Sequence, residues 1–230
     1  MSSIKCNETR SASFKKPKQT SEKSEKTRKN MIDRDAAWCL LTEFTQSESL
    51  RKHALAVEAC MRAYGRKFAA VSASASANDE ELWGIVGLIH DFDYEKYPSL
   101  DDHPYKGNAV LKERGWPEVI NRAVMSHAEY TGVSRDSMME KALFACDELA
   151  GFITAVALIK PGKSLAEVDT KSVRKRMKDK AFARKVHRED IINGAVGLGV
   201  DLDEHIGFCI EALKGIAQQL GLDGSAVKTV

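Results

Sequence analysis

The chain has 230 residues, of which 43% are apolar and 30% are charged, a composition typical of a globular protein with a core of its own. No apolar run approaches the about 20 residues that a membrane-spanning helix needs, so the sequence predicts a soluble protein with no membrane association. The net charge of +2 combines +6 on residues 1–30 with −4 on residues 31–230. The part expected to fold is therefore mildly acidic, which argues against specific nucleic-acid binding.

Residues 1–30 are rich in Ser, Thr and Lys and contain few bulky apolar side chains. Such a segment cannot bury enough apolar surface to offset the entropy lost on ordering, so we expect a disordered basic tail. It contains no apolar stretch of the kind found in secretory signals. The five cysteines are scattered and form no Cys-x-x-Cys motif, which is typical of free thiols in a reducing compartment, and we expect the protein to be cytoplasmic.

From Asp33 onward, apolar residues recur at the three- and four-residue spacing of amphipathic helices. Short polar residues that can cap helices precede several of these segments. No alternating strand pattern of useful length occurs, so the predicted fold class is all-α. The expected helices are 33–44 (capped by Asp33 or Asp35), 47–68 (capped by Ser47 or Ser49), 79–91 (capped by Asp79), 103–114, 117–127, 136–159, 188–198 and 202–220 (capped by Asp201 or Asp203), with a loop at 72–78 and short surface helices within 164–187.

We expect residues 31–222 to form one domain, with a core at 48–160, a helical extension at 161–222 and a flexible C-terminus at 223–230. Five segments of this domain place an imidazole or a carboxylate on, or at the end of, a core-facing helix surface. The six residues are His53, His90, Asp91, His103, His127 and Asp147.

A single histidine on an apolar helix face is more often a hydrogen-bonded core residue than a metal ligand. Asp147 is harder to explain in that way, because a buried carboxylate needs a cation or several donors. A shared metal site accounts for all six residues at once. Imidazole nitrogen and carboxylate oxygen suit divalent Mn, Fe, Zn or Ni, and six ligands are enough for one or two ions.

The order of His53, the His90-Asp91 pair and Asp147 resembles the HD superfamily of metal-dependent phosphohydrolases. The surrounding residues are similar too: Leu-x-x-His-Ala-x-Ala-Val contains His53, Gly-Leu-Ile-His-Asp contains the pair, and Ala-Cys-Asp-Glu-Leu contains Asp147. The resemblance covers about residues 48–160 and is strongest to small standalone HD hydrolases. It implies a helical bundle in which the metal lies between core helices.

The additional His103 and His127 resemble the extra histidines of the two-metal HD branches. One such branch is the cyclic-dinucleotide phosphodiesterases of the HD-GYP type, and three departures weigh against it. Ser126 precedes His127 where that branch has a second histidine, Ser49 occurs four residues before His53 in place of Glu, and the Gly-Tyr-Pro signature is absent. The six-residue set matches in order and type the other branch, the mixed-valent di-iron oxygenases.

The resemblance therefore implies a metal-dependent hydrolase that acts on a small phosphorylated compound or nucleotide through a metal-activated water. Asp91 would orient that water, and Lys106 is the first choice for a cation that binds the substrate phosphate. Two alternatives remain open: a di-iron oxygenase, and a non-catalytic HD module that binds a nucleotide or a partner protein.

Overall fold

The computed structural model of the protein describes residues 32–70 and 77–225, and within these ranges the chain is helical with no β-strand, which confirms the all-α fold class. The predicted basic tail and most of the predicted 72–78 loop lie outside the described residues. An isolated antiparallel bridge joins Ser164 to Asp223. The helices are α2 (Arg34–Phe44), α3 (Glu48–Ala69), α4 (Ala77–Ile89), α5 (Tyr105–Glu113), α6 (Glu118–Ser126), the 3-10 helix η1 (Glu129–Thr131), α7 (Met138–Leu158), the 3-10 helix η2 (Leu165–Glu167), α8 (Thr170–Met177), α9 (Arg188–Leu198), α10 (Leu202–Lys214) and α11 (Ala217–Leu220).

Three helices begin at residues that the sequence indicates as caps. The side chains of Asp33, Ser47 and Asp201 accept hydrogen bonds from the backbone N–H groups of the first turns of α2, α3 and α10. The long helix α7 has a reciprocal capping box, in which Ser137 and Glu140 each accept from the other's backbone N–H. These local interactions fix where the main helices of the domain begin.

Other boundaries differ from the predicted ones. Helix α4 begins at Ala77, so Asp79 lies in its first turn and does not precede it. Helix α5 begins at Tyr105, because Pro104 occupies the N-cap position. The single helix expected at 202–220 is divided into α10 and α11, since Gly215 weakens the helix and Ile216 leaves helical geometry.

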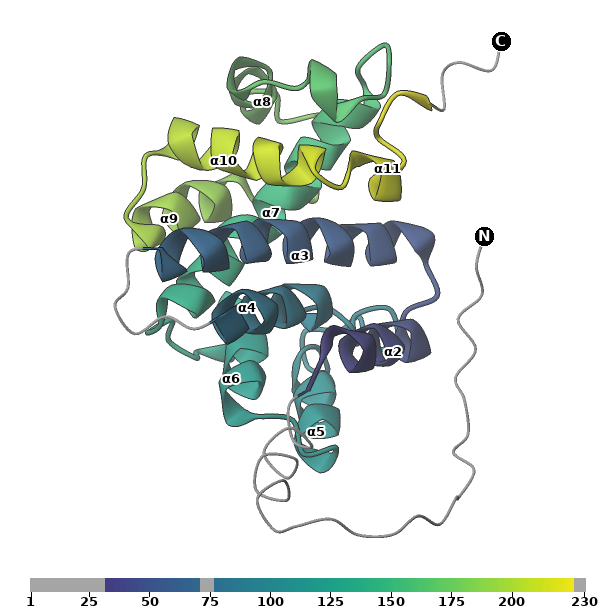
Figure 1. Ribbon diagram of the computed structural model, residues 1–230, viewed down its shortest axis with the longest axis vertical. Helices are drawn as coiled ribbons and strands as arrows, with labels where there is room; N and C mark the ends of the chain where they lie inside the picture. Colours follow the sequence, from purple (N-terminus) through teal and green to yellow (C-terminus); the bar gives the residue numbers. More distant parts are fainter. Residues whose placement is uncertain (1–31, 71–76, 226–230) are drawn as a thin grey trace, which may run out of the picture. The chain divides into compact units, whose positions relative to one another are not determined.

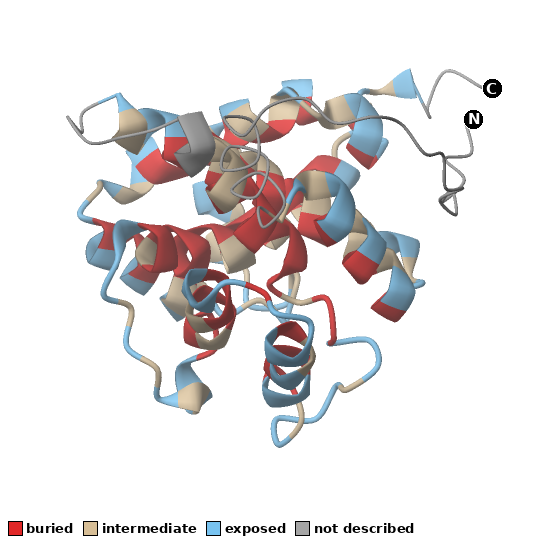
Figure 2. Cartoon of the chain, turned by 60° about the horizontal axis from the view of Figure 1, so that its bottom comes forward, coloured by how far each residue is buried: buried red, intermediate tan, exposed pale blue. Residues whose placement is uncertain are grey.

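Helices α3 and α7 are central to the unit formed by residues 32–225 (Figure 1). Helix α4 packs along one side of α3, while α10 and α11 contact α3 from the other side, and α9 packs against α7. The buried residues are concentrated in these central helices (Figure 2). Of the metal-ligand candidates, His53 and Asp147 belong to the central helices α3 and α7, and the others lie in segments next to helices.

The contact between α3 and α4 is close because α4 carries Gly87 where it crosses α3. A methyl group at Gly87 would lie 2.9 Å from Cγ of Met61 and 3.0 Å from the carbonyl oxygen of Val57. Glycine thus lets the two backbones approach each other. As a result, the C-terminal end of α4, where His90 follows, lies beside the part of α3 that carries His53.

Some polar groups of the core have structural partners of their own. Glu58 is buried and accepts from the guanidinium groups of Arg34 and Arg62. His205 lies between the hydroxyl of Tyr64 and the carbonyl oxygen of Ala145, at 2.6 and 2.9 Å. Cys60, Cys146 and Cys209 are buried free thiols. No helix in this part of the chain is both long and apolar enough to cross a membrane.

Candidate metal centre

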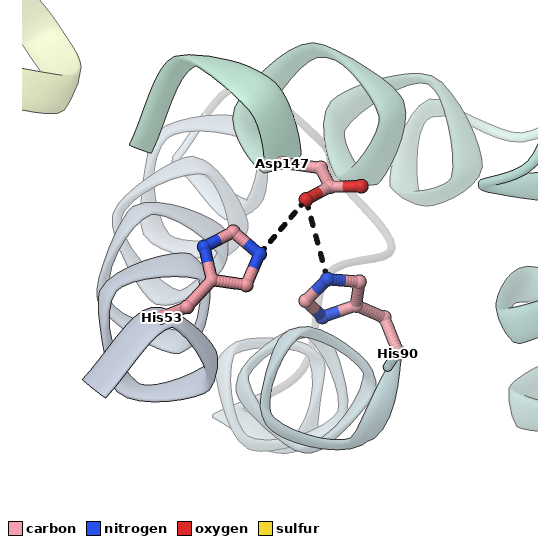
Figure 3. A group of neighbouring side chains, drawn as sticks. All are labelled: His53, His90 and Asp147. Atoms are coloured by element: carbon pink, nitrogen blue, oxygen red, sulfur yellow. Dashed lines mark hydrogen bonds and ion pairs between the residues drawn. The ribbon is translucent and has the colours of Figure 1, made fainter. Parts of the chain in front are cut away.

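His53, His90 and Asp147 come from three helical segments and meet at one point (Figure 3). His53 lies in α3, His90 directly follows α4, and Asp147 lies in the middle of α7. Oδ1 of Asp147 is 3.0 Å from Nε2 of His53 and 3.3 Å from Nε2 of His90. One candidate ligand atom from each residue lies within 4.8 Å of the others, so these three residues, here called the first triad, could hold a metal ion.

Asp91, His103 and His127 form a second triad of the same composition. His103 lies in the turn before α5, and His127 directly follows α6. Oδ1 of Asp91 is 3.2 Å from Nε2 of His103 and 3.1 Å from Nε2 of His127. The structure thus brings all six predicted ligands together as two groups of two histidines and one aspartate.

Asp91 connects the two triads. Its Oδ1 faces the histidine pair of the second triad, while its Oδ2 is 3.7 Å from Nε2 of His90 in the first. The rings of His90 and His127 are also in edge-to-face contact, with centroids 5.4 Å apart. A carboxylate in this position can serve two neighbouring ions, and two-metal sites commonly use such a group.

Three of the four histidines are held in an orientation that directs Nε2 toward the centre. Nδ1 of His90 donates to the carbonyl oxygen of Gly87 at 2.8 Å, and Nδ1 of His127 donates to that of Val124. Nδ1 of His103 donates to a carboxylate oxygen of Asp93 at 2.8 Å. A neutral imidazole with its proton on Nδ1 presents a lone pair at Nε2, which is the tautomer that a metal ligand needs.

Asp93 positions a ligand, a role that the sequence did not indicate. Its side chain is fully buried, and its second oxygen accepts from the backbone N–H of Gly107 at 2.8 Å. A hydrogen bond from a ligand histidine to a carboxylate is a common feature of metal sites in proteins. Asp93 lies two residues after Asp91, but nothing in that spacing identifies its partners, which follow 10 and 14 residues later.

Two further observations indicate that these residues fit divalent metal ions. Nε2 of His90 is completely buried and makes no hydrogen bond of acceptable geometry within the described residues, although Asp147 lies near it. A buried polar nitrogen without a partner is costly. In addition, the Nε2 atoms of His103 and His127 face each other at 3.3 Å. A cation at each triad would satisfy these nitrogen atoms.

In the metal-free protein the carboxylates and imidazoles hold each other in charged forms. Burial lowers the pKa of His90, but Asp91 and Asp147 outweigh it and raise that pKa to about 9. His103 behaves in the same way: burial is outweighed by Asp91 and Asp93, and its pKa is raised to about 9. Burial opposes ionisation of Asp91 and Asp147 as well, yet the nearby histidines lower the pKa of both carboxyls. These protons occupy positions that bound cations would take.

The centre is partly open to solvent. The side chains of His53, Asp91 and Asp147 are 22%, 26% and 20% exposed, whereas that of His90 is fully buried. Tyr130 lies beside the second triad, where its hydroxyl donates to the carbonyl oxygen of His103 at 2.8 Å. Solvent or a small molecule can therefore reach the carboxylates.

Lys106, the predicted phosphate-binding residue, is half-exposed in the first turn of α5. Its ammonium group pairs with Asp102 at 2.9 Å and lies over the ring of Tyr97. An exposed pair of this kind is weak, so it does not prevent Lys106 from binding a phosphate. The assignment of Lys106 stays a prediction.

A further group, Glu148, His187 and Asp190, also has candidate ligand atoms within 4.8 Å of one another. Burial and the neighbouring Asp147 raise the pKa of Glu148 to about 7. His187 is 73% exposed, and it belongs to the stretch that the sequence indicates only as polar surface. The sequence does not indicate this group, because Glu148 is 39 residues from His187 and 42 residues from Asp190.

Comparison of the chain with family models, with curated proteins and with solved structures found no match.

Proposed function

We propose that the protein is a metal-dependent phosphohydrolase of the HD type, acting on a small phosphorylated compound or nucleotide. The main support for the proposal is that six side chains with nitrogen or oxygen ligand atoms form two neighbouring triads. Asp91 belongs to the second triad and also lies close to the first. The order and sequence context of these ligands resemble the HD hydrolases, and their chemistry fits Mn, Fe, Zn or Ni. Bound metal would lower the pKa of a coordinated water toward about 7 and polarise a phosphoryl oxygen.

The protein's own residues would then bind the metal ions and orient the attacking water. His53, His90 and Asp147 hold one ion, and His103 and His127 hold the second with Asp91. Asp91 belongs to the second triad and also lies close to the first. It is therefore placed to accept a hydrogen bond from the attacking water and fix the direction of attack.

A second candidate function is a di-iron oxygenase. Each triad consists of two histidines and one carboxylate, which is the ligand set of many non-haem iron oxygenases. This candidate predicts bound iron, consumption of oxygen with an organic substrate and no release of phosphate.

The experiment is a panel of phosphomonoesters and nucleotides, assayed for phosphate release with added Mn²⁺, Ni²⁺ or Fe²⁺ and, in parallel, for oxygen consumption. We expect metal-dependent phosphate release that falls at least about 100-fold in Asp91→Asn, whereas Asp101→Asn, an exposed aspartate, retains activity. Oxygen uptake without phosphate release would support the oxygenase. Binding of a nucleotide with neither activity would support a non-catalytic module.

A further inference from the structure

A cavity of about 520 Å³ adjoins His53 on the side away from the other ligands of the first triad. Its walls come from the first turns of α3, the second half of α7, and the end of α11 with the two residues that follow it. Leu158, Leu220 and Leu222 make it largely apolar, and Lys52 supplies a cation at its edge. Small-molecule sites in proteins commonly have this size and this combination of an apolar wall with few polar groups.

His53 differs from the other three histidines in its Nδ1 atom. The Nδ1 atoms of His90, His103 and His127 each donate to a protein oxygen, but within the described residues no oxygen accepts from Nδ1 of His53. With Nε2 directed at Asp147, the proton of a metal-bound His53 resides on Nδ1, beside the cavity. Ligand histidines almost always donate that proton to an acceptor.

Gly151 is the second independent observation. It lies inside the long helix α7, where glycine destabilises by about 1 kcal/mol relative to alanine. A methyl group there would lie 3.6 Å from Nδ1 of His53 and 3.7 Å from Cε1, which is ordinary contact distance. Packing of the helix therefore does not require this glycine. Its effect is to leave Nδ1 of His53 uncovered on the cavity side.

Lys52 and Glu48 both line the cavity, so its wall carries one cation and one anion. The ammonium group of Lys52 pairs with Glu48 at 2.8 Å, but the side chain of Glu48 is 82% exposed. Such a pair is weak and easily exchanged. The same ammonium group lies 3.4 Å from the position that a methyl group on Gly221 would take, so it is beside the cavity wall.

We propose that this cavity binds a small organic anion with an aliphatic body, whose carboxylate or phosphate accepts from Nδ1 of His53 and pairs with Lys52. The aliphatic body contacts the three leucines. The inference goes beyond the proposed hydrolysis, because the ligand contacts His53 and no metal ion. It couples the two sites, since an acceptor on Nδ1 makes Nε2 a stronger metal ligand, and the coupling is reciprocal.

Isothermal titration of the full chain with acetate, butanoate, hexanoate and octanoate tests the proposal, in Mn²⁺-loaded and in EDTA-treated protein. We expect saturable one-to-one binding of octanoate. Affinity should increase up to about fourfold with each methylene group, and the loaded protein should bind more tightly. Inorganic phosphate, which has no aliphatic body, should bind at least tenfold more weakly than octanoate.

Gly151→Ala should weaken octanoate binding at least tenfold, because its methyl group covers Nδ1 of His53. Gly197→Ala is the matched control: it also replaces a glycine inside a helix, but its methyl group meets no atom within 4 Å. Lys52→Met should weaken binding of every carboxylate in the series by a similar factor.

Three outcomes would overturn the proposal: no saturable binding of any carboxylate, unchanged octanoate affinity in Gly151→Ala, or equal affinity in loaded and EDTA-treated protein. The Mn²⁺ content of each sample, measured separately, keeps a failure of the metal centre distinct from a failure of the cavity.

Discussion

Asp93 shows how much of the second triad depends on one buried carboxylate. One oxygen fixes the ring of His103 and the other anchors the first turn of α5 through the N–H of Gly107. The side chain of Asp93 fills the space beside Gly107, because a methyl group at Gly107 would lie 2.5 Å from the carboxyl carbon of Asp93. The ligand histidine and the helix that follows it therefore depend on the same side chain.

Asp93→Asn should weaken binding of the second metal ion by about 10- to 100-fold, because one of the two donors loses its acceptor and faces an amide NH₂ group. Calorimetric titration with Mn²⁺ measures this. Asp101→Asn, which changes an exposed carboxylate in the same loop, is the control. Equal Mn²⁺ affinity in the two variants would remove the role assigned to Asp93.

The raised pKa values of His90 and His103 make the stability of the metal-free protein depend on pH. Both are about 9 in the folded state, above the ordinary histidine value of about 6.5. Their contribution to the free energy of unfolding is fully present below about pH 6.5 and is lost as pH rises through about 9.

We expect the Tm of EDTA-treated protein to fall by at least about 4 °C between pH 7 and pH 9.5, which corresponds to roughly 1–2 kcal/mol for a domain of this size. Saturating Mn²⁺ should reduce this fall, since the ions replace the protons. Thermal melts at a series of pH values, with and without Mn²⁺, measure both effects. A Tm that is independent of pH in metal-free protein would contradict the ion pairs described for the triads.

At the scale of elements, glycines determine how closely helices approach α7. In α9, a methyl group at Gly194 would lie 2.6 Å from the Cα atom of Ala145, which is two residues before Asp147. Three residues further along the same helix, Gly197 has no neighbouring atom within 4 Å of such a methyl group. Substitution of Gly194 by alanine therefore changes both packing and helix propensity, whereas the same substitution at Gly197 changes helix propensity alone.

Gly194→Ala should destabilise the protein by about 1–3 kcal/mol, because α9 must move away from the backbone of α7. Gly197→Ala should be neutral or stabilise by up to about 1 kcal/mol. Urea denaturation of both variants measures the difference. If both variants changed stability in the same direction, the close contact of α9 with α7 would be in doubt.

The sequence allowed prediction of those parts of the fold that depend on local chemistry. The caps Asp33, Ser47 and Asp201 and the all-α class depend on short-range patterns, and these were confirmed. The start of α4 and the division between α10 and α11 were wrong, because side-chain patterns do not mark where a backbone leaves helical geometry.

The six candidate ligands could be recognised because each lies on, or at the end of, a predicted core-facing helix surface, and because their order resembles a known pattern of histidines and aspartates. Their partners could not. Asp93 and the cavity beside His53 depend on contacts between segments far apart in the sequence, and no periodicity reports such contacts.

At the scale of the whole domain, the site lies where five segments meet. The ligands come from α3, from α7, and from the chain next to the ends of α4, α5 and α6. These segments are also held in place by contacts that involve no ligand, such as the core packing of α3 against α4. The metal centre can therefore be preorganised before any ion binds, and loss of one ligand should leave the fold intact.

The metal content of purified protein, reconstituted with Mn²⁺ and dialysed, tests the central claim most directly. The two triads predict about two ions per chain for the wild type, and about one for either His53→Ala or His127→Ala, each of which removes a ligand from one triad only. Far-UV circular dichroism of the variants confirms that they fold. A folded wild-type protein that retains no stoichiometric metal, or variants with unchanged metal content, would contradict the claim.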